Sequence, residues 1–341
     1  MKALFLNLFV LTFSLAMMSC SDDDKGGDAP TPPEFTLDFN VETNQDQMGD
    51  FSHNKMVVFN GEVWSVGGYN SYSTVLQSDV WKSSNGRNWQ SVTSDQFPSR
   101  RDHSLTVFDN KLWVIGGSTD SSSGDLEELD DVWYSSDGLT WNLATDDALG
   151  VPNIGSHEAV VFNNKLFIIK SGVNEGAAGS TVWSSSDGIT WNRDSNNAFP
   201  HRVFFSATVF DNDIYVIGGA FGDPFVYYNA IYKSSDGINW IEVSPAAEVF
   251  SRRALHKTLT YENKLWVFGG IDESTSTGKG LWFSEDGSQW FRYEPLPAED
   301  GIYSFDALTF DGAIWIFGGM HQEEGTSTIT RVGTINTITQ I

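Results

Sequence analysis

The chain has 341 residues, one cysteine, and 20 Lys and Arg against 45 Asp and Glu, a formal net charge of −25. Such an acidic chain lacks the cationic surface needed to bind nucleic-acid phosphates or anionic lipid headgroups. A single cysteine excludes an intrachain disulfide and leaves only His and carboxylate side chains for a metal site.

The first twenty residues have the pattern of an export signal. Lys2 is followed by an apolar run up to Met17, and then come Ser19 and Cys20. The run is shorter than the roughly 20 residues of a membrane-spanning helix, which predicts a signal peptide over 1–19. The segment resembles a bacterial lipobox, and this resemblance implies diacylation of Cys20. Ordinary signal cleavage nearby is the alternative.

The stretch 20–34 predicts a flexible tether. It is rich in Asp, Gly, Pro and Thr, and a composition of this kind buries too little apolar surface to fold. The acidic residues 22–24 resemble the tract that directs some lipoproteins to the outer face of the outer membrane. We therefore expect an exported protein at the cell surface, attached to the membrane through its lipid alone.

A repeat of about 50 residues fills the remaining chain. Its firmest marker is a Trp or Tyr eight positions before a second Trp, with an Asn-Gly or Asp-Gly turn between them. Such dipeptides supply the positive φ of tight hairpins, so each repeat ends in two paired strands. The pairs are Trp81 with Trp89, Trp133 with Trp141, Trp183 with Trp191, Tyr232 with Trp240, and Trp282 with Trp290.

An earlier hairpin in each repeat gives four strands in total, and its second strand ends in a glycine pair. The third repeat has Lys170-Ser171 instead. These units resemble kelch repeats, which implies an all-β, six-bladed kelch-type β-propeller over 35–341. The last repeat lacks the Trp pair. We expect residues 35–43 to pair with it and close the ring, with closure by the C-terminal segment as the competing possibility.

The hairpin sequence Ser-Ser-Asp-Gly-x-x-Trp also resembles the Asp-box of sialidases, with one residue fewer before the Trp. We interpret these turns as structural, because hairpin geometry alone accounts for the Asp and the Gly.

Arginines recur at one position shortly before the innermost strand of several repeats. Arg100, Arg202 and Arg253 occupy this column and Arg101 adjoins it. They belong to the face that carries the variable loops, where function concentrates on rigid scaffolds. Guanidinium groups suit carboxylate or phosphate ligands, so we predict ligand binding here. Salt bridges to neighbouring acidic loops are the alternative.

Three positions later the column holds His103, His157 and His256, which we expect near the central channel. They are candidate ligand-binding residues, but we favour structural packing or hydrogen bonding, because kelch repeats, which these units resemble, commonly carry a structural histidine near this position. We expect no metal. Phe225 and Tyr227, in the loop of the fourth repeat, could stack on sugar rings or pack within the loop. The acidic segment 120–131 could hold Ca²⁺, but it has no EF-hand spacing and solvated acidity is the simpler interpretation.

No set of residues predicts catalysis or a cofactor. We expect a monomeric, non-catalytic module that recognises carbohydrate or protein through its variable-loop face. The kelch resemblance also extends to galactose oxidase and the N-acetylneuraminate epimerases. The copper enzyme is excluded, because it needs a cysteine cross-linked to a tyrosine and Cys20 is the only cysteine. An epimerase-like sugar enzyme is the alternative function, while a sialidase would need a Tyr and Glu pair with no candidate here.

Overall fold

The computed structural model describes residues 37–42, 48, 51–70, 75–120, 125–150, 156–246, 249–272, 280–293, 302–322, 329–331 and 335–340. The predicted signal peptide, Cys20 and the predicted tether lie outside these residues. The segment Phe35–Ile341 forms one compact unit. No helix in the described ranges is long and apolar enough to cross a membrane.

Antiparallel sheets make up almost all of the described structure. Within these ranges, five sheets have four strands each. They are β7 (Ser104–Phe108), β8 (Lys111–Asp120), β9 (Leu126–Ser135) and β10 (Asn142–Thr145); β11 (Glu158–Phe162), β12 (Lys165–Lys170), β13 (Thr181–Ser185) and β14 (Asn192–Ser195); β15 (Ser206–Phe210), β16 (Asp213–Ile217), β19 (Ile231–Ser234) and β20 (Ile241–Val243); β21 (Lys257–Tyr261), β22 (Lys264–Phe268), β23 (Leu281–Ser284) and β24 (Phe291–Tyr293); and β26 (Asp306–Phe310), β27 (Ala313–Phe317), β30 (Ile335–Gln340) and β1 (Leu37–Glu42).

A further sheet has five strands. It contains β2 (Phe51–Ser52), β3 (Lys55–Phe59), β4 (Glu62–Asn70), β5 (Val75–Ser83) and β6 (Gln90–Thr93). Two small sheets join β17 (Ala220–Phe221) to β18 (Val226–Tyr227), and β25 (Ile302–Tyr303) to β28 (Met320–Gln322) and β29 (Ile329–Arg331). One short 3-10 turn, η1 (Val173–Glu175), follows β12.

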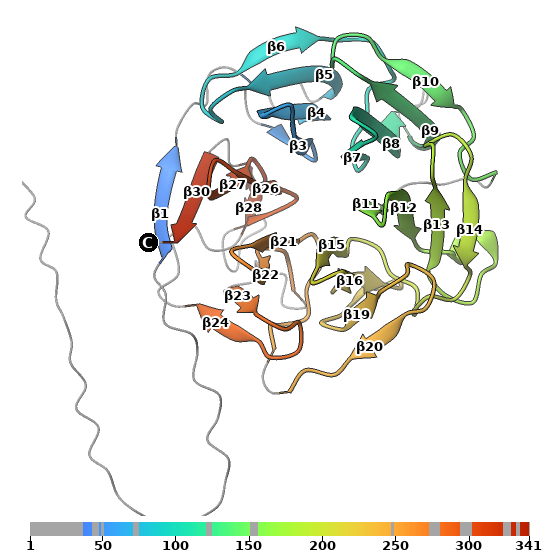
Figure 1. The fold of residues 1–341 in the computed structure, drawn as a ribbon, viewed down its shortest axis with the longest axis vertical. Coiled ribbons are helices and arrows are strands. Elements are labelled where there is room, and N and C mark those ends of the chain that lie inside the picture. Colours follow the sequence, from blue (N-terminus) through green and yellow to red (C-terminus); the bar gives the residue numbers. More distant parts are fainter. Residues whose placement is uncertain are drawn as a thin grey trace, which may run out of the picture. The chain divides into compact units, whose positions relative to one another are not determined.

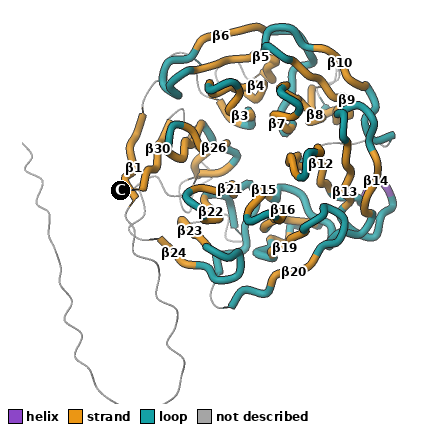
Figure 2. The backbone as a smooth tube through the Cα atoms, in the orientation of Figure 1, coloured by secondary structure: helices purple, strands orange, loops and turns teal. Residues whose placement is uncertain are grey.

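The larger sheets of this unit stand around a common axis (Figure 1). The strands toward the axis are β3, β7, β11, β15, β21 and β26, and those at the rim are β6, β10, β14, β20, β24 and β1. Figure 2 shows how loops connect the rim of one sheet to the inner strand of the next. This arrangement confirms the predicted all-β propeller. At the sheet nearest the C-terminus, the rim strand is β1, which pairs with β30 in the antiparallel register Leu37↔Gln340 to Glu42↔Ile335.

The turn glycines explain how neighbouring sheets pack. A Cβ added at Gly138 would lie 2.1 Å from the ring of Trp64, which belongs to the preceding sheet. Glycine therefore serves both the positive φ of the turn and the close approach of an aromatic ring. The same contact recurs between other sheets, in the pairs Gly86 with Trp315, Gly188 with Trp113, Gly237 with Phe167, and Gly287 with Tyr215.

The aspartates of these turns bind their own backbone. Asp137 Oδ1 accepts hydrogen bonds from the N–H groups of Leu139 and Thr140, at 2.8 and 2.9 Å. These hydrogen bonds lower the pKa of Asp137. Three further hairpins repeat the arrangement with an aspartate and a fourth with Asn85, which supports the interpretation of the Asp-box-like sequences as structural turns.

Candidate functional site at the ring axis

Among the described residues, six non-glycine residues with left-handed backbone stand two positions before the innermost strands. Their φ angles lie between 49° and 58°. This conformation costs an ordinary residue roughly 1–2 kcal/mol and concentrates at ligand sites. The six are His53, Asp102, Ser156, Phe204, Leu255 and Ser304.

Backbone hydrogen bonds between neighbouring sheets account for part of this conformation. The N–H of Leu255 donates to the carbonyl of Phe204 at 2.9 Å, and the N–H of Ser304 donates to the carbonyl of Leu255 at 3.2 Å. The N–H of His53 then donates to the carbonyl of Ser304 at 3.3 Å. Each bond needs the peptide turned toward the axis, so the side chains of these residues are presented around the axis.

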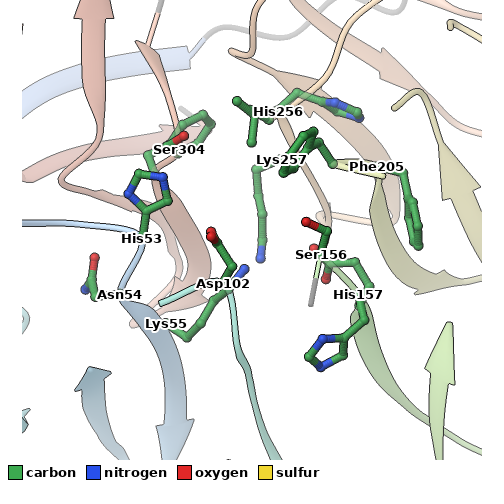
Figure 3. A pocket seen from close by; sticks show the side chains of 14 residues that line it. His53, Asn54, Lys55, Asp102, Ser156, His157, Phe205, His256, Lys257 and Ser304 are labelled. Carbon is green, nitrogen blue, oxygen red and sulfur yellow. The ribbon is translucent and has the colours of Figure 1, made fainter. Parts of the chain in front are cut away.

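All six residues line a cavity of about 70 Å³ at the ring axis (Figure 3). A water molecule takes roughly 30 Å³ of liquid volume, whereas drug-sized ligands occupy roughly 300–1,000 Å³. The cavity therefore admits a small group such as a carboxylate, while the rest of any ligand must lie above it.

Two lysines reach toward the middle of this cavity from β3 and β21 (Figure 3). Lys257 Nζ lies 2.6 Å from Asp306 Oδ1. Burial alone would lower the pKa of Lys257, but Asp306 and Glu158 outweigh burial and raise it. For Lys55 the described part of the chain provides no carboxylate partner within salt-bridge distance. Its ammonium is therefore the cation of the cavity that can accept an anionic ligand group.

The three histidines of the column are buried. His103 is fully buried, and a Cβ on Gly67 of the preceding sheet would lie 2.9 Å from its ring. Burial lowers the pKa of His103 well below its usual range, and Arg100 lowers it further. Burial likewise lowers the pKa of His256 to about 3, so this ring is neutral near pH 7. His157 and His256 line the axial cavity, whereas His103 is not among its lining residues.

The arginine column does not form a ligand-binding surface, and this corrects the sequence-based hypothesis. Arg100, Arg202 and Arg253 are 0%, 1% and 0% exposed. In each case Nη1 donates to the carbonyl of the first glycine of the pair, at Gly116, Gly218 and Gly269. A guanidinium group that is buried and engaged in its own sheet cannot reach a ligand at the surface.

Each arginine has its own buried surroundings. Arg100 forms a bidentate salt bridge with Asp131, at 2.7 and 2.9 Å. For this arginine the structure therefore shows the alternative given above, a salt bridge to the acidic segment instead of ligand binding. Arg202 lies between aromatic rings, the nearest being Tyr232 at 4.6 Å from the ring centroid, and burial lowers its pKa. Arg101 is partly exposed and lies 3.7 Å from Asp102.

The described residues of the acidic segment 120–131, which are 120 and 125–131, are mostly strand. β8 and β9 extend their pairing to Asp120↔Leu126, so residues 126–131 belong to a hairpin. Glu127 and Glu128 are exposed. Across the described ranges, no three His, Cys, Asp or Glu side chains gather closely enough to hold a metal ion.

The aromatic loop lies beside the axial cavity. Phe225 is 50% exposed, and its ring packs edge-on against Phe204 with centroids 5.9 Å apart. Phe204 lines the cavity, so the exposed ring of Phe225 lies next to the cavity opening. Phe221 stacks on His201 at 5.3 Å. Tyr227 is half-buried, and burial followed by the charge of Asp272 raises its pKa.

Sequence reasoning missed the charged residues of the axis. They occupy the position directly after the histidine column, where the repeats read Lys55, Ser104, Glu158, Ser206, Lys257 and Asp306. Charged side chains are rarely buried, so a charged residue on an inner strand that otherwise faces a packed core indicates a candidate functional site. This signal was overlooked because the arginines, although buried, are the more conspicuous cations in an acidic chain.

Comparisons with known proteins agree with this fold. Residues 40–130 match the DUF6242 beta propeller domain. The solved structure of YjhT superimposes with a TM-score of 0.67 and 13% sequence identity, over 85% of this chain and 95% of YjhT. At this identity the likeness concerns the fold alone. The chain is a β-propeller. No curated protein matches it in sequence.

Proposed function

We propose that this propeller is a lipid-anchored protein of the outer membrane, displayed on the cell surface, that recognises a carbohydrate carrying an anionic group and does not transform it. The ammonium of Lys55 carries the proposal, because it has no carboxylate partner among the described residues and lines a cavity of about 70 Å³. A carboxylate fits this volume and can pair with the Lys55 ammonium, in a lining that also holds Lys257 and the carboxylates of Asp102 and Glu158.

The aromatic shelf formed by Phe204 and Phe225 supports a carbohydrate as the remainder of the ligand. Sugar rings present apolar C–H faces, and an exposed aromatic ring beside a polar cavity suits them. The buried histidines favour binding over catalysis: with a pKa of about 3, His256 holds no proton to donate near pH 7. An epimerase-like activity would have to use other groups.

We further propose that the scaffold is a six-bladed kelch-type ring closed by β1. In the five-stranded sheet, β2 pairs only with Tyr69 and Asn70 at the far end of β4, beyond the glycine pair. Without this addition, β3 to β6 make an ordinary four-stranded blade. The pairing of β1 with β30, and the packing of Gly86 on Trp315, support closure between the first and last repeats.

A glycan array of carboxylated and sulfated glycans beside their neutral counterparts tests the recognition proposal with the full chain. We expect binding to acidic glycans, with loss of affinity in Lys55→Gln and Phe225→Ala. Lys165→Gln, at the exposed start of β12, and Leu139→Ala, in the exposed turn after β9, serve as matched controls. Equal binding of acidic and neutral glycans, or unchanged binding by Lys55→Gln, would contradict the proposal.

A further inference from the structure

A second concave surface lies at the rim of the ring, away from the axis. It has a volume of about 590 Å³ and is lined by residues 193–198, which include the end of β14, and by residues 238–240 in the turn before β20. We call it the rim groove. Its volume falls within the roughly 300–1,000 Å³ of ligand sites, whereas that of the axial cavity does not.

The lining of the rim groove is polar and close to neutral. Three exposed amides, those of Asn196, Asn197 and Asn239, can each donate and accept hydrogen bonds. The lining holds one cation, Arg193, and one carboxylate, Asp194, so its formal charges sum to zero. Such a surface offers hydrogen bonds without selecting a charged ligand, although the whole chain is strongly acidic.

An apolar face completes the groove. Ile238 is 47% exposed, and Trp240 is half-buried beside it. The indole Nε1 of Trp240 donates to the carbonyl of Gly237 at 3.1 Å, which fixes the ring in place. Amides next to a fixed aromatic ring match the alternation of hydroxyl groups and C–H faces on a sugar.

Buried charges hold Arg193 at the groove. Its Nη2 lies 3.0 Å from Glu175 Oε2, and the other carboxylate oxygen of Glu175 lies 2.6 Å from Lys170 Nζ. The guanidinium also lies over the ring of Trp183, 5.4 Å from its centroid. Figure 2 shows η1, which supplies Glu175, beside β14.

This network explains why the third repeat departs from the glycine pair. Lys170-Ser171 replaces the glycines, and η1 then brings Glu175 under the rim strand. The side chains of Lys170 and Glu175 are 3% and 0% exposed. Buried ion pairs of this kind contribute little net stability compared with apolar packing, which favours a role in orienting Arg193.

A similar constraint acts on the opposite wall. Asn239 Nδ2 donates to Asp236 Oδ2 at 2.8 Å. Hydrogen bonds from the Asn239 amide contribute to lowering the pKa of Asp236 to about 2, against the effect of burial. An ionised Asp236 can only accept hydrogen bonds, so the side-chain NH₂ group of Asn239 faces it. The Oδ1 atom of Asn239 is then left to accept a hydrogen bond from a ligand. Both walls are thus arranged before any ligand arrives.

From this geometry we infer that the rim groove binds an uncharged oligosaccharide, at a site separate from the axial cavity. Asn196 and Asn239 contact its hydroxyl groups from the two walls, and Ile238 and Trp240 receive its apolar face. The axial cavity selects an anionic group through Lys55, so the two sites take different parts of a glycan or different glycans.

Isothermal titration of the full chain with short neutral gluco-, manno- and xylo-oligosaccharides tests the inference. We expect one series to bind, and the double variant Asn196→Ala, Asn239→Ala to weaken it by at least about tenfold, the equivalent of roughly one or two hydrogen bonds. The matched control is Asp146→Ala, Thr190→Ala, which changes the corresponding positions of the preceding rim and turn. It should leave the affinity within about twofold.

The axial variant Lys55→Gln, Phe225→Ala distinguishes the two sites, because it should retain neutral oligosaccharide binding while losing acidic glycans. The inference is overturned if no neutral oligosaccharide binds the unaltered chain. It is equally overturned if the groove variant and its control weaken binding alike, or if the axial variant abolishes binding of the neutral ligand.

Discussion

The N–H of His53 donates to the carbonyl of Ser304 at 3.3 Å, so the first and last repeats meet at the ring axis. Both residues have left-handed φ angles, 58° and 54°. The same residues line the axial cavity. Ring assembly and the shape of the candidate site therefore depend on the same backbone conformation.

The segment that contains β1 should stabilise the whole propeller. Leu37 is buried in an apolar cluster with Tyr293, and its N–H donates to the Tyr293 hydroxyl at 2.7 Å. Leu37→Ala should lower the free energy of unfolding by about 2–5 kcal/mol, as for other buried leucines. Urea denaturation measures the change. Leu143→Ala, on the exposed rim strand β10, is the control and should change stability by less than about 0.5 kcal/mol.

The glycine pairs should tolerate no side chain. At Gly117 the φ angle is +103°, and an added Cβ would lie 2.6 Å from the carbonyl oxygen of Arg101. Gly117→Ala should therefore lower the melting temperature strongly, because backbone atoms must shift. Gly61→Ala is a matched control: φ is +76° and nothing lies within 4 Å of the added Cβ, so only the left-handed penalty of roughly 1 kcal/mol applies. Equal losses would argue against close packing as the reason for the pair.

The repeat made most of the fold predictable from sequence. Trp133, Trp141 and the turn Asp137-Gly138 predict the last hairpin of the second repeat, which the structure forms from β9 and β10. The connection is longer than the tight turn we expected: it covers 136–141, Gly138 has the positive φ, and the pairing is shifted between Leu143 and Thr145. The small sheet formed by β17 and β18 was not predictable. Other repeats also pair their strands beyond the glycine pair, but the residues of these loops differ between repeats, so the sequence shows no common pattern there.

The candidate site was less predictable, because residue type does not report burial. Arg100 and Lys55 are both cations near the start of an inner strand, yet one is fully buried against Asp131 and the other lines the axial cavity. Arg100 and His103 are both buried, and two residues separate them. One of the two, Asp102, has a left-handed backbone and lines the axial cavity, and no glycine in the sequence marks this turn.

Arg100 should act on stability and not on ligand binding. Arg100→Ala leaves Asp131 buried without its partner, which typically costs about 3–5 kcal/mol. Arg101→Ala is the control. The Arg101 side chain is partly exposed, and its contact with Asp102, at 3.7 Å, is longer than the contacts of Arg100 with Asp131. Thermal denaturation should separate the two variants, whereas glycan binding by folded protein should be the same in both. Selective loss of binding in Arg100→Ala would restore a ligand-binding role for this column.

Acid should destabilise the propeller through its buried histidines. The pKa of His256 is about 3 in the folded chain against an ordinary value of 6.5. Between these two pH values the histidine is protonated in the unfolded chain and neutral in the folded chain. Stability from this group is complete above pH 6.5 and falls as the pH drops toward 3, by about 2 kcal/mol at pH 5. His103 shifts in the same direction and adds to the loss.

The variant His256→Phe isolates this contribution, because Phe205 and Phe305 occupy the same column in other repeats and show that the position accepts the ring. Between pH 7 and pH 5, urea denaturation should show a loss of stability smaller by about 2 kcal/mol in the variant than in the unaltered chain. His201→Phe, which changes a half-buried ring outside the column, should keep the pH dependence of the unaltered chain. An unchanged pH dependence in His256→Phe would mean that this histidine is not held neutral by burial.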